Sequence, residues 1–302
     1  MSQSIAYKPA EYKEIVDSVF TPNPKLPCKP MTGGAVGKVY RVEAQQPFVV
    51  KVNPEFDAQE YHFYAELSEA IATPEQVTPR IVYWEQRDID GNPCGVQVYP
   101  YLVGRTLDHV PIPEESSVIG GTIYELHQRL CEMTPRFDRV IGSIDPVLRF
   151  ILDRLEKCAI RERGYRLLEN PRYKELMSQE EQYLIAWDLN PTNILLDHRA
   201  DGLRVKIIDL ALFYGPAVMQ PASFAACFMV LHNEPFSLET AMNYWPEPLD
   251  KRDVLLMMQP WFLIVGSARE HMLANHSTSD PEHQRDVVNR MVRYTDIISM
   301  KL

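Results

Sequence analysis

The segment 186–209 constrains this chain more than any other part of its sequence. Asp188 and Asn193 stand five residues apart between two apolar runs, and Asp209 ends a short β-like segment downstream. Phosphoryl transfer from ATP uses such a set. One carboxylate takes or orients the proton of the attacking hydroxyl, while an Asn and a second Asp hold magnesium on the phosphates. An Asp and an Asn at this spacing also occur by chance, so the interpretation depends on what precedes them.

A glycine-containing turn lies upstream, between two β-like segments. Gly33, Gly34 and Gly37, with Val39 after them, would let backbone N–H groups approach phosphate oxygens closely. The protein-kinase pattern G-x-G-x-x-G-x-V is met at Gly34, Gly37 and Val39, whereas Thr32 stands where its first Gly would be. A plain glycine hairpin is the alternative interpretation.

The next candidate is Lys51, which ends the strand-like run 48–51 just after this loop. A Lys at this place can reach the α- and β-phosphates, and a Glu on the following helix can hold it in position. Glu60 is the first choice for that partner and Glu66 the second. An edge-strand Lys that faces water is the alternative.

The order of these features decides between the interpretations. Taken alone, Asp188 fits a turn-forming residue before Asn190-Pro191, and Asp209 fits a strand-end cap. Together, the glycine loop, strand Lys, helix Glu, Asp–Asn pair and strand-end Asp follow one another as a kinase requires. We therefore expect Asp188 as the base and Asn193 and Asp209 as ligands of Mg²⁺, with ATP as the nucleotide.

The pattern of apolar residues predicts an α+β protein in two lobes, a small antiparallel sheet with one helix over 1–102 and a larger helical lobe over 103–302. A nucleotide is expected in the cleft between them. Strands are expected at 36–52 (two or three), 80–84, 96–101, 183–186, 194–196 and 205–208. Helices are expected at 56–71, 118–130, 146–168, 224–231, 238–244, 250–273 and 281–300.

Composition excludes several other classes. The net charge of −10 argues against nucleic acid as a partner, and the five cysteines are odd in number and widely spaced, without a C-x-x-C pair. The first 13 residues lack the apolar stretch of a signal peptide, and no apolar run reaches the length of a membrane span. A cytoplasmic protein without a membrane partner is expected. The sequence leaves its oligomeric state open.

Several of these motifs resemble the aminoglycoside phosphotransferase and choline kinase-like family, relatives of protein kinases. The run 188–195, Asp-Leu-Asn-Pro-Thr-Asn-Ile-Leu, is similar to the family's Asp-Leu-His-Pro-Gly-Asn-Ile-Leu, and 207–209 is similar to its Ile-Ile-Asp. Leu126-His127 resembles a Leu-His pair of the helix before the catalytic loop, where the His is structural. The resemblance extends from Thr32 to about Tyr214.

The resemblance implies a protein-kinase-like fold and a transfer of the γ-phosphate of ATP to a hydroxyl group of a small molecule. It also implies a hinge at Val98, Tyr99 and Tyr101, whose backbone would bind adenine. An amine-bearing acceptor, such as an aminoglycoside or choline, would suit acidic and aromatic side chains of the helical half. Candidates by position alone, each with a solvated helix face as the alternative, are Tyr214, Glu234, Glu239, Trp245, Glu247, Asp250 and Asp253.

The chain also departs from the family pattern. Ala186-Trp187 stand where the family has His-Gly, so the catalytic loop needs a different support, for which Trp187 packing is one possibility. Asp209-Leu210-Ala211 lacks the Phe-Gly of protein kinases, and no Ala-Pro-Glu follows it. These differences favour a small-molecule acceptor. An atypical protein kinase and a non-catalytic nucleotide-binding scaffold remain as alternatives.

Overall fold

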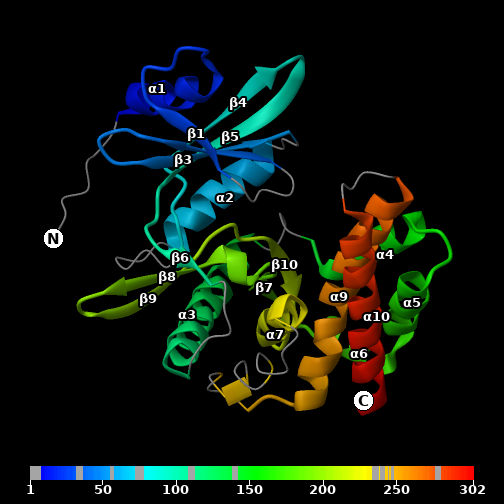
Figure 1. Cartoon of the computed structure of the whole chain (residues 1–302). Helices are drawn as coiled ribbons and strands as arrows, with labels where there is room; N and C mark the ends of the chain where they lie inside the picture. The colour runs from blue at the N-terminus through cyan, green and yellow to red at the C-terminus, as the bar shows by residue number, and fades with distance from the viewer. Residues whose placement is uncertain are drawn as a thin grey trace. The chain divides into compact units, whose positions relative to one another are not determined.

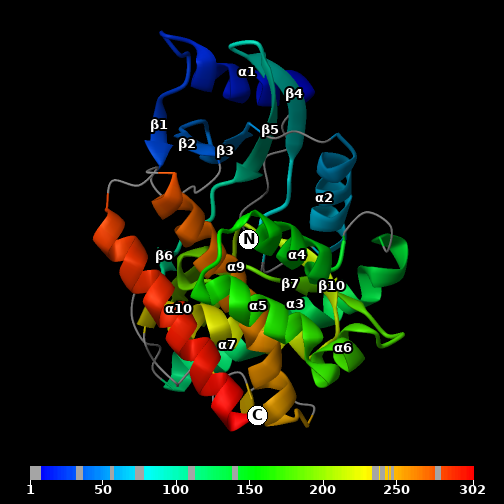
Figure 2. The same ribbon diagram turned by 90° about the vertical axis from the view of Figure 1, so that its right-hand side faces the viewer.

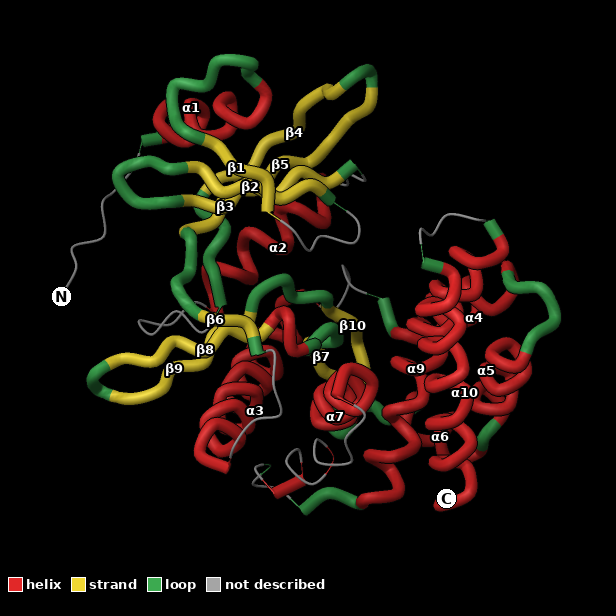
Figure 3. The backbone as a smooth tube through the Cα atoms, in the orientation of Figure 1, coloured by secondary structure: helices red, strands yellow, loops and turns green. Residues whose placement is uncertain are grey.

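The structure is a computed structural model, and it describes residues 8–31, 37–54, 58–71, 78–107, 113–137, 142–232, 238, 242–243, 245, 248–275 and 280–302. The chain divides into two compact units, Met1–Gly104 and Arg105–Leu302. The first contains an antiparallel sheet with helices, and the second is mostly helical (Figures 1 and 3). The α+β fold expected from the sequence is confirmed. The roles given to its two parts stay predictions.

The first unit is built on a five-stranded antiparallel sheet in the order β1-β2-β3-β5-β4. Its strands are β1 (Cys28–Met31), β2 (Lys38–Val42), β3 (Phe48–Asn53), β4 (Tyr83–Ile89) and β5 (Asn92–Pro100). In β3 the residues alternate between buried and half-buried, as expected for a strand that presents different faces to its surroundings. Asp90 and Gly91 both have positive φ, +54° and +80°, which suits the tight turn between β4 and β5.

Helix α1 (Pro9–Phe20) packs on one face of this sheet and was not expected from the sequence. Ile15 and Val16 are buried in the same cluster as Phe48, Val50 and Val98. The apolar residues of α1 recur at the i, i+3, i+4, i+7 spacing of a core-facing helix. They are Tyr12, Ile15, Val16 and Val19. The helix therefore completes the hydrophobic core of the first unit.

Helix α2 (Ala58–Ile71) packs on the opposite face, and its described bounds lie within the expected 56–71. A Cβ atom on Gly95 would lie 2.2 Å from the Tyr61 ring, so only glycine at this position of β5 lets α2 approach so closely. Gly95 and Val96 are consecutive in the strand and face opposite sides, and Val96 belongs to the cluster under α1. The sheet thus lies between the two helices (Figure 1).

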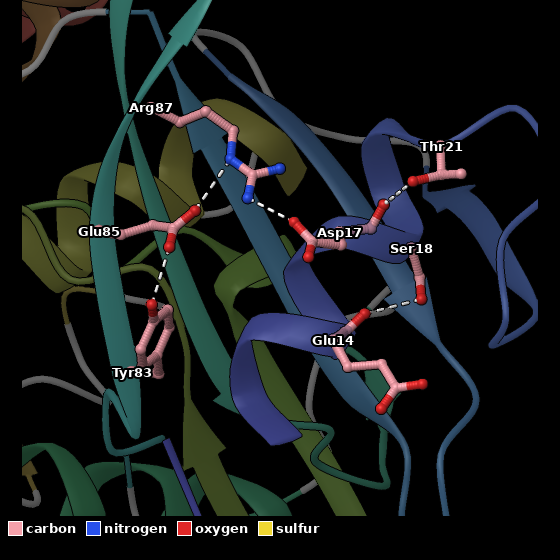
Figure 4. A network of polar contacts seen from close by, with 7 residues as sticks. All are labelled: Glu14, Asp17, Ser18, Thr21, Tyr83, Glu85 and Arg87. Carbon is pink, nitrogen blue, oxygen red and sulfur yellow. Dashed lines mark hydrogen bonds and ion pairs between the residues drawn. The ribbon is translucent and has the colours of Figure 1, made fainter. Parts of the chain in front are cut away.

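A polar network also joins α1 to β4 (Figure 4). The Arg87 guanidinium donates to Asp17 of α1 at 2.5 Å and to Glu85 at 2.9 Å. The Tyr83 hydroxyl donates to the other Glu85 oxygen at 2.7 Å. Burial, followed by this bond to a carboxylate, raises the pKa of Tyr83 to about 12. The Phe20 ring lies 4.8 Å from the guanidinium carbon of Arg87, so α1 is fixed by polar and apolar contacts together.

The second unit begins with β6 (Arg105–Thr106) and contains two small antiparallel sheets, β6-β8-β9 and β10-β7. Its other strands are β7 (Tyr183–Ala186), β8 (Ile194–Arg199), β9 (Gly202–Ile207) and β10 (Leu212–Gly215), with the short 3₁₀ helix η1 (Pro191–Asn193) before β8. Its helices are α3 (Pro113–Phe137), α4 (Ile144–Arg154), α5 (Ala159–Glu169), α6 (Pro171–Met177), α7 (Met219–His232), α9 (Lys251–Ala274) and α10 (Pro281–Lys301). Most of the expected 238–244 helix lies outside the described residues.

The expected single helix at 146–168 is wrong, because the structure has two helices there. Helix α4 ends before Leu155, and α5 begins after Cys158, whose backbone is extended. The chain then folds back, so that α5 packs on α4 at Gly164. A Cβ on Gly164 would lie 2.4 Å from a Leu152 methyl group. Packing of the two amphipathic faces against each other thus replaces the continuous helix.

The helices of this unit are joined by ion pairs between their partly buried faces. Arg163 of α5 donates to both carboxylate oxygens of Asp296 on α10, at 2.8 and 2.6 Å. Arg172 of α6 does the same to Asp253 of α9, at 2.9 and 2.6 Å. Helices α9 and α10 run side by side (Figures 1 and 2). Among the described residues, no helix combines the length and the apolar character of a membrane span.

Candidate active site

The side chains of Asp188, Asn190 and Asn193 form one hydrogen-bonded group in the loop between β7 and β8. Asn190 donates from Nδ2 to Oδ1 of Asp188 at 2.9 Å. Asn193 donates from Nδ2 to the other carboxylate oxygen at 3.2 Å and to the backbone carbonyl of Asp188 at 3.0 Å. Each oxygen of the predicted base is therefore held by an amide, which fixes the plane of the carboxylate.

The side-chain amide of Asn190 cannot flip by half a turn without losing the hydrogen bonds that its oxygen accepts. Its oxygen accepts hydrogen bonds from the backbone N–H groups of Thr192 and Asn193, at 3.0 and 3.2 Å, and from the Thr192 hydroxyl. Asn190 thus caps the 3₁₀ turn η1 through its oxygen and holds Asp188 through its nitrogen. Sequence reasoning assigned no role to Asn190. Its position as an Asx residue before Pro191 is the signal for the cap.

Two backbone hydrogen bonds, one on each side of Asp209, connect its segment to the same loop. The N–H of Ile208 donates to the carbonyl of Asn193 at 2.8 Å, and the N–H of Trp187 donates to the carbonyl of Ala211 at 2.7 Å. Between these ties, Asp209 has φ of +56°, a left-handed conformation that non-glycine residues rarely adopt. Such backbone strain is concentrated at functional sites, where the surrounding structure enforces it.

The arrangement fits a magnesium ion held together with a nucleotide. Both Asn193 Nδ2 bonds go to Asp188, and within the described part of the chain Oδ1 of Asn193 accepts no hydrogen bond. Asp209 is exposed. Among the described residues, no group of three or more His, Cys, Asp and Glu side chains could hold a metal by itself. Magnesium usually binds through one or two protein oxygens together with phosphates and water, so the two predicted ligands suffice.

The strand that leads into this loop is held by side chains from two helices. Gln220 of α7, which is 0% exposed, accepts from the Ala186 N–H and donates to the Ala186 carbonyl, both at 2.9 Å. Thr134 of α3 accepts from the Leu184 N–H at 2.9 Å. The Trp187 carbonyl accepts from the Ser223 hydroxyl. Sequence reasoning missed Gln220, Thr134 and Ser223, because only the fold brings them to this strand.

Trp187 itself packs against Phe213 of β10, edge to face, with ring centroids 5.7 Å apart. The possibility raised from the sequence, that Trp187 packing helps to support the loop, therefore accounts for part of the support. The buried thiol of Cys227 also donates to the Trp187 carbonyl, at 3.9 Å. Burial, and then the nearby Asp188 charge, hold the pKa of Cys227 well above its usual value, so the thiol stays neutral.

In the first unit, Val39 and Lys51 are directly opposite each other on β2 and β3 and share one face of the sheet. It is the face on which α2 packs, because Lys51 has the same parity in β3 as Asn53, which is opposite Gly95. A Cβ on Gly37 would lie 2.7 Å from the Val52 carbonyl oxygen, so glycine is needed at this position, immediately before β2 begins. Gly33, Gly34 and the Glu60 side chain lie outside the described residues. Their roles stay predictions.

Part of the predicted hinge is occupied by the sheet itself. Val98 is fully buried on the α1 face, opposite to Lys51, and its carbonyl accepts from the Val82 N–H at 2.9 Å. The Tyr101 N–H donates to the Pro47 carbonyl at 3.0 Å, and the Arg41 guanidinium lies 4.2 Å from the Tyr101 ring. Tyr99 shares the Lys51 face and donates from its hydroxyl to Gln97 at 2.8 Å.

Four of the remaining sequence candidates have structural partners. Glu66, the second choice for pairing with Lys51, is exposed and pairs with His62 at 3.3 Å. Asp250 caps α9, Asp253 is bound to Arg172, and the Tyr214 hydroxyl donates to the Thr134 carbonyl. These groups are used in holding the fold and are poor candidates for substrate contacts. Glu234, Glu239 and Glu247 lie outside the described residues.

The predicted structural role of His127 agrees with its surroundings in α3. The side chain is 6% exposed and lies against Trp245, with ring centroids 4.9 Å apart, and against Tyr183 at 6.3 Å. The Cys131 sulfur lies 3.4 Å from its Nε2. Burial lowers the pKa of His127 to about 4, so the ring is neutral near pH 7. Trp245 is thereby part of a buried aromatic cluster.

Solved structures show which known fold this is. Choline kinase LicA from Streptococcus pneumoniae matches with a TM-score of 0.66 at 14% identity, over 95% of this chain and 99% of that chain. A thermostable mutant of aminoglycoside phosphotransferase APH(4)-Ia matches with 0.63 at 13% identity, over 93% and 98%. The GDP and kanamycin complex of APH(2")-IIIa matches with 0.60 at 14% identity, over 97% and 99%.

At these identities the likeness is one of fold. No protein-family model and no curated protein sequence matches the chain. The chain has the protein-kinase-like fold found in aminoglycoside phosphotransferases and choline kinase, as the sequence motifs predicted.

Proposed function

We propose that this chain, with the fold of small-molecule phosphotransferases, transfers the γ-phosphate of ATP to a hydroxyl group of a small molecule. The observation that most strongly supports this proposal is the group formed by Asp188, Asn193 and Asp209. The Asp188 carboxylate is held by two amides, and one of them, Asn193, has an Oδ1 that accepts no hydrogen bond within the described residues. A strained Asp is tied to the same loop. Phosphoryl transfer uses functional groups of these kinds, which supports the proposal.

Each residue has a distinct role in the proposed reaction. Asp188 accepts the proton of the acceptor hydroxyl or aligns that hydroxyl for in-line attack on the γ-phosphorus. Asn193 and Asp209 hold Mg²⁺, which when bound neutralises charge on the phosphates. Lys51 contacts the α- and β-phosphates and Glu60 positions Lys51, while the loop with Gly33, Gly34 and Gly37 covers the phosphates. Because the transition state is loose, positioning and charge neutralisation supply most of the rate.

We propose that the base of the nucleotide binds at Tyr99 and the residues that follow it. The Tyr101 N–H and the Val98 carbonyl already have partners in Pro47 and Val82, the residues just before β3 and β4. Hydrogen bonds to adenine from this segment would therefore come from other backbone groups. The units Met1–Gly104 and Arg105–Leu302 would supply the nucleotide-covering and the catalytic groups, respectively.

An acceptor with an amine group is the favoured class. The solved structures with the same fold include complexes with kanamycin and hygromycin B. The sequence lacks an Ala-Pro-Glu segment after Asp209, which argues against a protein substrate. We place the reaction in the cytoplasm, where ATP is abundant. An atypical protein kinase is the second candidate, since Lys51, Asp188, Asn193 and Asp209 are equally compatible with it.

Calorimetric titration of MgATP tests the nucleotide part of the proposal. The wild-type protein should bind ATP with magnesium and much more weakly without it. Lys51→Met should weaken MgATP binding about 10- to 100-fold, the worth of one charged hydrogen bond. Asp209→Ala should remove most of the magnesium-dependent part. Lys38→Met is the matched control, because Lys38 pairs with Val52 on the opposite face of the same sheet.

Two results would contradict the proposed contacts with the nucleotide. If both Lys51→Met and Asp209→Ala bind MgATP as tightly as the wild type, these residues do not contact the nucleotide. A fall of many degrees in the melting temperature of Lys51→Met, with MgATP affinity intact, would identify Lys51 as a structural residue.

A further inference from the structure

Within the described residues, strand β7, which leads directly into Asp188, pairs with another strand on one edge only. β10 pairs with it through Leu212 opposite Ala186 and Gly215 opposite Tyr183. Leu184, Ile185 and Ala186 are all fully buried, so water cannot satisfy the backbone groups of the other edge. Other protein groups must therefore bind the N–H and C=O groups that β10 does not reach.

The amide of Gln220 provides such groups at Ala186. Its oxygen accepts from the Ala186 N–H and its nitrogen donates to the Ala186 carbonyl, both at 2.9 Å. A side-chain amide has the same donor and acceptor as a peptide group, so Gln220 takes the place of a neighbouring strand at this residue. Its side chain is 0% exposed, which excludes competition from solvent.

The same helix holds the following residue. Ser223, one turn further along α7, donates to the carbonyl of Trp187, and Cys227 donates to the same oxygen at 3.9 Å. The Trp187 carbonyl, which belongs to the peptide group that leads into Asp188, is thus held by α7. The N–H groups of Ala186 and Trp187 are held by Gln220 and by the Ala211 carbonyl, respectively. Two consecutive residues are fixed immediately before the predicted base.

From this geometry we infer that Gln220 is a positioning residue for the proposed reaction, with Ser223 as its auxiliary. Gln220 contacts no reacting group and acts through the backbone, because it fixes the point from which Asp188 extends. This inference rests on the proposed function. It assigns to α7 the part of the support that Trp187 packing on Phe213 does not provide.

The test compares three variants in magnesium-dependent ATP hydrolysis, with water as the acceptor. Gln220→Met keeps the length of the side chain and removes both hydrogen bonds. Its kcat should fall about 10- to 100-fold, because a small misplacement of a catalytic group has effects of that size. Its KM for MgATP should stay within about twofold, since the nucleotide ligands are unchanged. Ser223→Ala, a milder change, should lower kcat in the same direction by less.

Gln284→Met is the matched control for loss of a buried amide. Gln284 lies in α10, is 7% exposed, and has an Oε1 without a hydrogen-bond partner in the described residues. Its replacement should leave kcat unchanged. Amide hydrogen exchange gives a second readout that is independent of activity. In Gln220→Met, the Ala186 amide should exchange faster, while amides of α10 keep their rates.

The outcomes separate the inference from the proposed function. If the wild type is active and both Gln220→Met and Ser223→Ala keep full kcat, the positioning role alone is overturned. This holds whether or not the Ala186 amide exchanges faster. Equal losses in kcat for Gln220→Met and Gln284→Met also overturn it, because they indicate a general loss of stability. A wild type without any magnesium-dependent turnover overturns the proposed function and, with it, the catalytic role of Gln220.

Discussion

At the scale of single residues, Asp188 and Asp209 are held by different means. Asp188 is fixed through its side chain, by the amides of Asn190 and Asn193. Asp209 is fixed through its backbone, in a left-handed conformation between two tied neighbours. A rigid carboxylate suits a base that must meet one hydroxyl. A backbone under strain persists only where the surrounding bonds outweigh a cost of about 1–3 kcal/mol.

His127 allows a prediction at the same scale, because burial lowers its pKa to about 4 while the unfolded chain has about 6.5. As the pH falls from 6.5 toward 4, the unfolded chain binds a proton at His127 that the folded chain does not. The free energy of unfolding should therefore fall over this interval, by about 2 kcal/mol between pH 7 and pH 5. His127→Leu should lack this part of the pH dependence.

Urea unfolding of both proteins at the two pH values measures the difference. Groups other than His127 titrate in both proteins and cancel in the comparison. An identical loss of stability in the wild type and the variant would show that His127 is protonated in the folded protein.

At the scale of elements, α1 is an integral part of the first unit. Ile15 is 1% exposed, against the same sheet that carries Lys51. Ile15→Ala should lower the free energy of unfolding by about 2–4 kcal/mol, through lost burial and a residual cavity. Glu14→Ala is the control, because the Glu14 side chain is 44% exposed and its pair with Lys25 at 3.3 Å contributes little. Its effect should stay within about 0.5 kcal/mol.

Chemical denaturation of the two variants distinguishes a core helix from an accessory arm. Equal stabilities would mean that α1 packs too loosely to contribute. Helix propensities of such residues differ from that of alanine by less than about 0.7 kcal/mol, so an effect of about 2–4 kcal/mol at Ile15 cannot come from helix propensity.

The sequence predicted those helices and strands whose apolar residues form a recognisable local pattern. The strands expected at 36–52 and the helix expected at 56–71 both appear in the structure, as β2, β3 and α2. The division of 146–168 into two helices depends on how Gly164 meets Leu152, which no local pattern contains. Helix α1 had a clear signal in its spacing.

At the scale of the whole molecule, the groups proposed to act on ATP are divided between two units. Lys51 belongs to the first, and Asp188, Asn193 and Asp209 belong to the second. The sequence predicted the second set because its members are close together along the chain and follow a motif. It could not predict Gln220 or Asn190 in their roles, because these depend on the partners that folding brings to the backbone of β7 and the carboxylate of Asp188.

The central claim is a transfer of phosphate in which Asp188 acts on the acceptor. The most direct measurement follows labelled γ-phosphate from MgATP into a panel of amino alcohols, aminoglycosides, sugars and nucleosides, with the wild type and with Asp188→Asn. Wild-type protein should label at least one acceptor. Asp188→Asn, which keeps the shape and removes the charge, should transfer phosphate about 100- to 10,000-fold more slowly while MgATP affinity survives. Near-wild-type transfer by Asp188→Asn, or label that enters protein and no small molecule, would contradict the account.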